Sequence, residues 1–131
     1  MAEETTLESV MACVRAAMEK RAADPVVLDV RGLSGVTDFF LIVGGSSDRR
    51  VQSIAEGVIE AMEARGRRPL GVEGLREGRW VLLDFGDWVV HVFYEELRGF
   101  YDLEGLWFDA PRPEIPPDVL APAPRARGAD A

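Results

Sequence analysis

The sequence has few of the residues that build covalent cross-links, catalytic dyads or membrane spans. It contains one cysteine, Cys13, and one histidine, His91. A single cysteine excludes an internal disulfide framework and any multi-cysteine metal site, which fits a reducing compartment. The start, Met-Ala-Glu-Glu, lacks the basic and apolar regions of a signal peptide. No apolar run approaches the roughly 20 residues that cross a bilayer. We therefore expect a cytoplasmic protein that does not enter a membrane.

Basic residues are also in short supply. The chain has 15 Lys and Arg against 23 Asp and Glu, which gives a formal net charge of −8. Direct binding to nucleic acid needs a surplus of basic side chains at the phosphates, so we expect no direct contact with nucleic acid. A basic protein is the partner that this charge favours.

Apolar periodicity predicts two amphipathic helices. The first covers residues 5–22, because an apolar stripe with helical spacing runs through it. Thr5 and Glu8 have the spacing of a capping box at its start. The second helix follows a glycine-rich turn and has Ser47 or Asp48 as its N-cap.

Short apolar runs predict five strands, and their order with the helices predicts the fold class. The strands are expected over residues 26–30, 38–43, 67–72, 80–85 and 88–94, followed by a short helix over 95–101 and a packed return segment over 102–108. Each long helix has a single apolar face. We therefore predict a two-layer α/β sandwich, in which helices cover one face of a mixed five-stranded sheet and leave the other face open.

The composition changes near residue 110. Six of the eight prolines lie beyond this point, among Ala, Arg and Asp, and such a segment has little apolar surface to bury. We expect one domain over residues 1–110 and a Pro/Ala-rich disordered tail over residues 111–131.

The central feature is a predicted hairpin with a two-residue loop at Gly86-Asp87. With this loop, Phe85 lies opposite Trp88 and Leu82 lies opposite His91. Because strand side chains alternate, one face is wholly apolar and is assigned to the core: Val81, Leu83, Phe85, Trp88, Val90 and Val92. The other face, which we call the second face, mixes polar and apolar residues: Trp80, Leu82, Asp84, Val89, His91 and Phe93.

Three features invite a catalytic interpretation, and in each case we favour a structural one. The stretch 44–47, Gly-Gly-Ser-Ser, would suit a phosphate, but it lacks the Lys-Ser/Thr ending of a P-loop, and a tight strand-to-helix turn explains it. Asp84 and Asp87 would need further ligands to hold a divalent ion, and Asp is ordinary in a turn. His91 faces Leu82 rather than an acid or a nucleophile, although a hydrogen bond donated by its ring to the diagonal Asp84 carboxylate would fix the ring. We expect no cofactor and no metal.

Trp80 and Phe93 make the second face unusual. Two large aromatic rings on an open face would lose the stabilisation that burial gives, and exposed apolar patches with a polar rim mark interfaces. The alternative is that another segment, such as residues 103–108, folds over them. The sequence leaves both interpretations open.

A set of short motifs along the chain resembles the ribosomal silencing factor family, also called the Iojap family. The resemblance runs from about residue 28 to residue 111. It is carried by Leu28-Asp-Val, Gly32-Leu-Ser-x-x-Thr37-Asp38-Phe-Phe, Gly45-Ser-Ser, Val51-Gln-x-Ile54-Ala, Pro69-x-Gly-x-Glu73-Gly74, Trp80-Val-Leu-Leu-Asp84-x-Gly86-Asp87-x-Val-Val-His91-Val-Phe, Arg98-x-Phe-Tyr101-x-Leu-Glu104-x-Leu-Trp107 and Asp109-Ala-Pro111.

The resemblance implies a fold similar to the nucleotidyltransferase core and binding to the large ribosomal subunit through ribosomal protein fourteen, on the face that meets the small subunit. Such factors block subunit joining and lower translation in nutrient limitation or stationary phase, and some form homodimers. We therefore expect a non-enzymatic repressor of translation. Its expected docking residues are Trp80, Leu82, Asp84, Asp87, Val89 and His91.

The alternative function is a metal-dependent nucleotidyltransferase that uses Ser46, Asp48 and Asp84. Gly45-Ser46 resembles the start of the motif of those enzymes. The following Asp48-Arg49-Arg50 lacks the second carboxylate of that motif, and a shared fold does not carry a shared activity.

Overall fold

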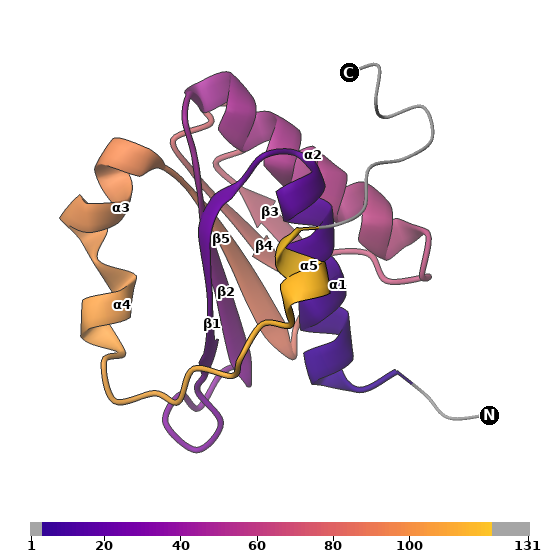
Figure 1. Cartoon of the computed structure of the whole chain (residues 1–131), viewed down its shortest axis with the longest axis vertical. Helices are drawn as coiled ribbons and strands as arrows, with labels where there is room; N and C mark the ends of the chain where they lie inside the picture. The colour runs from indigo at the N-terminus through magenta and orange to yellow at the C-terminus, as the bar shows by residue number, and fades with distance from the viewer. Residues whose placement is uncertain (1–3, 122–131) are drawn as a thin grey trace.

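A computed structural model describes residues 4–121 and contains the predicted succession of helices and strands (Figure 1). The elements are α1 (Thr6–Glu19), β1 (Ala23–Asp29), β2 (Phe39–Gly45), α2 (Asp48–Glu63), β3 (Gly71–Glu73), β4 (Trp80–Asp84), β5 (Trp88–Tyr94), α3 (Glu95–Tyr101), α4 (Leu103–Leu106) and α5 (Pro117–Leu120).

The strands form one sheet in the order β1-β2-β5-β4-β3. β2 and β5 run parallel, and the other neighbouring pairs run antiparallel. Two long helices, α1 and α2, lie side by side on one face (Figure 1). The predicted two-layer α/β architecture with a mixed five-stranded sheet is confirmed.

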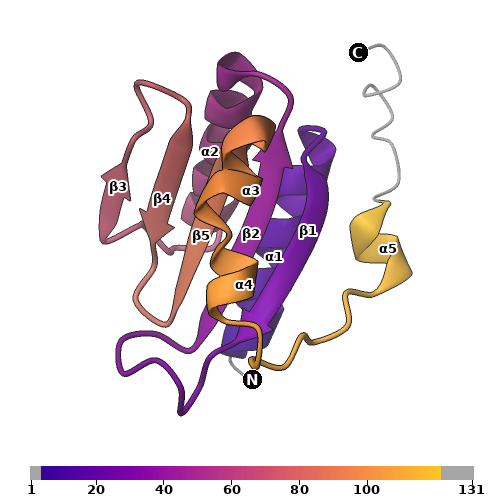
Figure 2. The same ribbon diagram turned by 90° about the vertical axis from the view of Figure 1, so that its left-hand side faces the viewer.

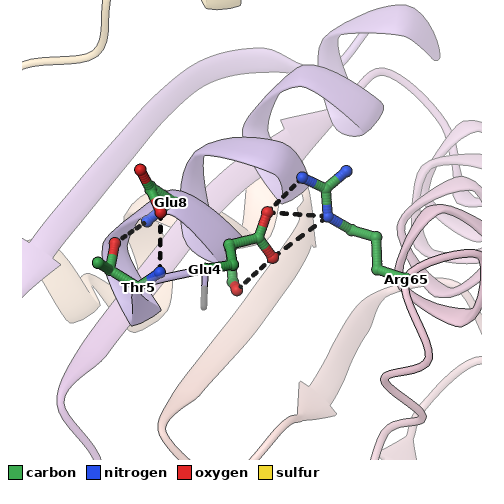
Figure 3. Close-up of polar contacts among 5 residues, drawn as sticks. Glu4, Thr5, Glu8 and Arg65 are labelled. Carbon is green, nitrogen blue, oxygen red and sulfur yellow. Dashed lines mark hydrogen bonds and ion pairs between the residues drawn. The ribbon is translucent and has the colours of Figure 1, made fainter. Parts of the chain in front are cut away.

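The starts of the two long helices are fixed by side chains that cap them. The Thr5 hydroxyl accepts a hydrogen bond from the Glu8 backbone N–H at 3.1 Å, and the Glu8 carboxylate accepts one from the Thr5 N–H at 2.8 Å (Figure 3). This is the predicted capping box. Ser47 caps α2 by accepting a bond from the Arg50 N–H at 3.0 Å.

An ion pair ties the two long helices together. Glu4, just before α1, binds the guanidinium of Arg65, just after α2 (Figure 3). The bond to this guanidinium holds the pKa of the Glu4 carboxyl below its usual value. The pair is partly exposed, so its contribution to stability is small.

The hairpin places its apolar face under α1 and α2. Its six core residues, Val81, Leu83, Phe85, Trp88, Val90 and Val92, are all buried in the main apolar cluster, as predicted. Gly86 has a φ of 90°, a backbone conformation that the first position of a two-residue hairpin loop requires and that glycine adopts without strain.

Several helices and strands begin or end at residues other than the predicted ones. α1 ends at Glu19 rather than at residue 22, because Arg21 adopts a left-handed backbone angle, with a φ of 66°. β1 begins at Ala23, three residues early, with an irregularity in its pairing before Val26. The edge strand β3 spans only Gly71–Glu73.

The second face of the sheet is covered in part, and the expectation that it is open is wrong. α3, α4 and the residues up to 108, which we call the strap, lie on the side of the sheet opposite α1 and α2 (Figures 1 and 2). Leu97, Leu103 and Trp107 of the strap pack against a second, smaller buried cluster that includes Phe93. Burial of these apolar side chains explains why the strap folds back on the sheet.

The structure also differs from the predicted tail. Residues 111–121 are described, and α5 packs on α1. Val119 is buried in the main cluster, and Ile115, which precedes α5, packs against the same cluster. Asp118 pairs with Arg15 at 3.0 Å. The rest of the predicted disordered tail, residues 122–131, lies outside the described residues.

Over residues 4–121, none of the helices combines the length and apolar character that a bilayer span requires.

Candidate docking surface

The predicted register of the hairpin is the observed one. Trp80 pairs with Phe93, Leu82 with His91, and Asp84 with Val89. The Phe85 N–H donates to the Trp88 carbonyl at 2.9 Å and closes the loop at Gly86-Asp87. The six side chains of the second face therefore share one side of β4 and β5, as expected.

The partner of His91 is Trp80 and not Asp84. The Trp80 indole N–H donates to His91 Nδ1 at 3.1 Å. The Asp84 carboxylate instead accepts a bond from the Gly86 N–H at 2.8 Å, within the turn. The proposed Asp84–His91 hydrogen bond is wrong because the turn offers the carboxylate a closer backbone donor, which alternation along a strand does not reveal.

His91 lies inside the sheet surface. Its side chain is 5% exposed, and Phe40 meets it edge-on with ring centroids 5.2 Å apart. Burial lowers the pKa of His91 to about 4, because the charged imidazolium loses its hydration. The ring is therefore neutral at physiological pH, and as a buried neutral base it is a poor general acid.

Trp80 is the centre of an aromatic cluster. Its ring stacks on Phe93 with centroids 4.8 Å apart and meets Tyr101 of the strap at 4.7 Å. Trp107 of the strap lies 5.7 Å from Phe40. The sequence left open whether Trp80 and Phe93 lie on an exposed interface or beneath another segment. Phe93 is fully buried, as the covering interpretation expects, whereas Trp80 remains partly exposed at the rim.

Polar contacts hold the strap in place. Arg98, whose side chain is 12% exposed, pairs with Glu104 at 3.0 Å. It also donates to the carbonyls of Ala23 and Asp24 at the start of β1. Asp102 ends α3 with a left-handed φ of 47° and caps α4 by accepting a bond from the Gly105 N–H at 3.0 Å.

The strap leaves part of the second face uncovered. Figure 2 shows it crossing β5 and β2, with β4 and β3 beside it. Leu82 and Asp84 are partly exposed and Asp87 is exposed, whereas Val89 and His91 are buried. The predicted docking residues thus fall into two groups, with Trp80, Leu82, Asp84 and Asp87 at the surface and the other two beneath.

The strap adds exposed apolar residues that the sequence reasoning missed: Phe100, Tyr101, Leu106 and Phe108, which are 78%, 46%, 69% and 78% exposed. Phe100 and Tyr101 are adjacent on one short helix, so they point to different sides of it. That adjacency is the signal in the sequence that not all of the aromatic residues there are buried.

The three residues of the enzymatic alternative are not all brought together, because Asp84 lies apart from Ser46 and Asp48. Ser46, Asp48, Arg79 and Tyr94 line a small cavity of about 240 Å³ at the start of α2. Asp84 lies at the other end of β4, about 13 Å along the strand from Trp80 at a rise of about 3.3 Å per residue. Over residues 4–121, no three His, Cys, Asp or Glu side chains gather in a metal-binding group. Ser47 acts as the helix cap, as the structural interpretation expects.

Comparison with known proteins identifies relatives along nearly the whole chain. Residues 3–131 match the sequence profile of a family described as "Ribosomal silencing factor during starvation". A Bacillus subtilis protein named "Ribosomal silencing factor RsfS" is 46% identical over 97 residues, which cover 74% of this chain and 82% of the relative. The crystal structure of a Chromobacterium violaceum protein superposes with a TM-score of 0.78 and 30% identity, and the match covers 90% of this chain and 98% of that one.

A more distant relative carries a name that concerns one ribosomal subunit. The mouse protein named "Mitochondrial assembly of ribosomal large subunit protein 1" is 29% identical over 92 residues. The match covers 68% of this chain and 40% of the mouse protein.

Proposed function

This chain belongs to the ribosomal silencing factor family, and we propose that it represses translation by binding the large ribosomal subunit and excluding the small one. A ribosome-associated, regulatory silencing role comes with the family. The finer proposal is that ribosomal protein fourteen is the contact and that the block operates when nutrients are scarce. The observation that carries the proposal is the family match over residues 3–131, and the name of the mouse relative supports the large subunit as the target.

The docking surface in this proposal is the uncovered part of the second face with the rim of the strap. Trp80 and Leu82 supply apolar contact, and Tyr101 extends the patch because it packs on Trp80 and is 46% exposed. Val89 and His91 are buried beneath and support the surface. Tryptophan and tyrosine are the side chains that most often dominate the energy of an interface.

The charges around this patch suit a basic protein. Asp84 and Asp87 lie at the hairpin end of the surface. The strap adds the exposed acids Glu95, Glu96 and Asp102, Asp109 follows directly after it, and the one arginine of the strap is already paired with Glu104. An acidic rim around an apolar centre steers a basic partner into place.

Steric exclusion requires size and position rather than chemistry. A globular body formed by residues 4–121, the part of the chain that the structure describes, has a radius of gyration of about 13 Å. A body of that size on the face where the subunits meet would keep apart surfaces that must come within a few ångströms for bonding. No catalytic step is needed, which agrees with the regulatory name of the family.

Sedimentation with purified subunits tests the function. Wild-type protein should travel with large subunits, should not travel with small subunits, and should reduce the joined fraction when both subunits are mixed. Failure to bind large subunits, or binding without any loss of joining, would overturn the proposal.

A pair of charge-matched variants tests the surface. We expect Asp84→Asn with Asp87→Asn to weaken binding about tenfold, since two interfacial charge pairs at about 0.7 kcal/mol each sum to one decade. Glu56→Gln with Glu60→Gln changes the net charge equally on the exposed side of α2 and should bind as the wild type does. Equal binding by both folded variants would remove the second face from the proposal while leaving the function in place.

A further inference from the structure

The only histidine of the chain hydrogen-bonds the central residue of the proposed docking surface. Trp80 and His91 are not directly opposite each other. They are diagonal neighbours on β4 and β5, because Trp80 pairs with Phe93 and Leu82 pairs with His91. The indole N–H nevertheless reaches His91 Nδ1 at 3.1 Å. We propose that His91 is a positioning residue, whose Nδ1 fixes the Trp80 ring so that it meets the ribosomal partner through carbon atoms alone.

The hydrogen bond determines the tautomer of the histidine. Because Nδ1 accepts the Trp80 proton, the proton of the neutral imidazole sits on Nε2. His91 Nε2 is buried and has no hydrogen-bond partner among the described residues. An unpartnered buried N–H is unfavourable, and a leucine or phenylalanine at this position would avoid it. Unlike leucine or phenylalanine, histidine at this position offers Nδ1 as an acceptor for the Trp80 N–H, and this acceptor is what distinguishes it from them.

The bond orients Trp80 rather than merely satisfying its N–H. Trp88, on the core face, is fully buried and its indole N–H has no partner among the described residues. Packing on all sides holds that ring. Trp80 is partly exposed, so water would satisfy its N–H if the ring turned outward. The bond to His91 selects the inward orientation, in which the ring stacks on Phe93 and meets Tyr101.

A fixed orientation has a consequence for recognition. The N–H is the only polar group of an indole, and here it is directed at the protein. Trp80 therefore contributes apolar contact to the complex, while Asp84 and Asp87 contribute charge. A side chain that is already held in its bound orientation also loses less conformational entropy on binding.

The inference rests on the proposed function, and nuclear magnetic resonance tests its geometry independently of any ribosome. The indole N–H signal of Trp80 is assigned by its loss in Trp80→Phe. We expect slow exchange of this proton with solvent and a long-range nitrogen spectrum in which Nε2 of His91 is protonated and Nδ1 is not. His91→Phe should speed the exchange of the Trp80 proton at least tenfold and leave the Trp88 proton unchanged. A Trp80 proton that exchanges equally fast in both proteins would overturn the proposal.

Binding to purified large subunits tests the consequence. We expect His91→Phe to bind about tenfold more weakly and His91→Asn, whose amide oxygen can replace Nδ1 as the acceptor, to recover most of the loss. In a Trp80→Phe background, His91→Phe should have no further effect, because the donor is already absent. If His91→Phe does not fold, the affinities of His91→Asn and Trp80→Phe for large subunits are compared with that of the wild type.

The experiments distinguish a failure of the proposed function from a failure of the positioning role of His91. A slow Trp80 proton in a wild-type protein that does not bind large subunits overturns the proposed function and retains the hydrogen bond. Wild-type affinity in His91→Phe, together with a released Trp80 proton, overturns the positioning role and retains the function.

Discussion

Leu82 and Leu83 are neighbours on β4, and they lie on opposite faces of the sheet. Leu83 is fully buried under α1 and α2. Leu82 is partly exposed on the second face, opposite His91. Two identical side chains at adjacent positions thus have different surroundings. Leu83 meets the packed helical layer, and Leu82 lies on the face that the strap covers only in part.

The two covers differ in the apolar surface that they bury. Over residues 4–121, the cluster under α1 and α2 contains 22 buried residues, whereas the cluster under the strap contains five. The long helices have 14 and 16 residues, and the helices of the strap have 7 and 4. Elements with little buried apolar surface open at lower cost than the core. The thick layer therefore contributes most to the stability of the fold, and the thin one borders the docking surface that we propose.

The largest expected effect tests the two leucines against each other. Leu83→Ala should lower the free energy of unfolding by about 2–5 kcal/mol, because it removes buried carbon atoms and leaves a cavity. Leu82→Ala should cost about 1 kcal/mol or less, because its side chain already meets water. Urea unfolding followed by circular dichroism measures both.

The pair also separates stability from function. We expect Leu82→Ala to weaken binding to large subunits at nearly unchanged stability, and Leu83→Ala to bind as the wild type does wherever it remains folded. Equal losses of stability in the two variants would mean that the second face is as well packed as the core, and the contrast between the faces would disappear.

The second prediction uses the buried histidine of the second face. Its pKa is about 4 in the folded protein and 6.5 when exposed, so between these values the unfolded chain binds a proton that the folded chain does not. Stability is therefore lost as pH falls through this window, by about 2 kcal/mol between pH 7 and pH 5. Urea unfolding at both pH values measures the loss, and His91→Phe should show little of it.

Carboxylates do not account for that loss. The pKa values of Glu4 and Asp29 lie below their ordinary values of 4.5 and 3.8 because each binds an arginine, so the stability that they add declines at lower pH. A wild-type protein as stable at pH 5 as at pH 7 would show that His91 is more accessible to water than its position indicates.

The hairpin could be predicted from the sequence because its determinants are local. A two-residue loop fixes the register, Gly86 supplies the positive φ that the loop needs, and alternation then assigns every side chain to a face. The capping box of Thr5 and Glu8 is local in the same way. Helical periodicity located α1 and α2 for the same reason.

The covering of the second face by residues 103–108 could be named from the sequence only as one of two alternatives, because it depends on contacts between distant segments. Trp107 meets Phe40 across 67 positions of sequence, and no local pattern indicates which strand a return segment will cover. The hydrogen bond of Trp80 depends on ring orientations rather than on alternation. Val119 was missed because composition averages over a proline-rich stretch, whereas burial depends on the individual apolar residue.

The smallest effect is expected where α3 meets α4. Asp102 combines a left-handed backbone with a side chain that caps α4. Asp102→Ala removes the cap and should cost about 1 kcal/mol, and Asp102→Asn, which can cap and tolerates a positive φ, should cost almost nothing. Because the strap can open without the core, the loss should appear as faster hydrogen exchange in α3 and α4, with little change in exchange at β5. Uniformly faster exchange across the sheet in Asp102→Ala would show instead that the thin cover and the thick layer unfold as one unit.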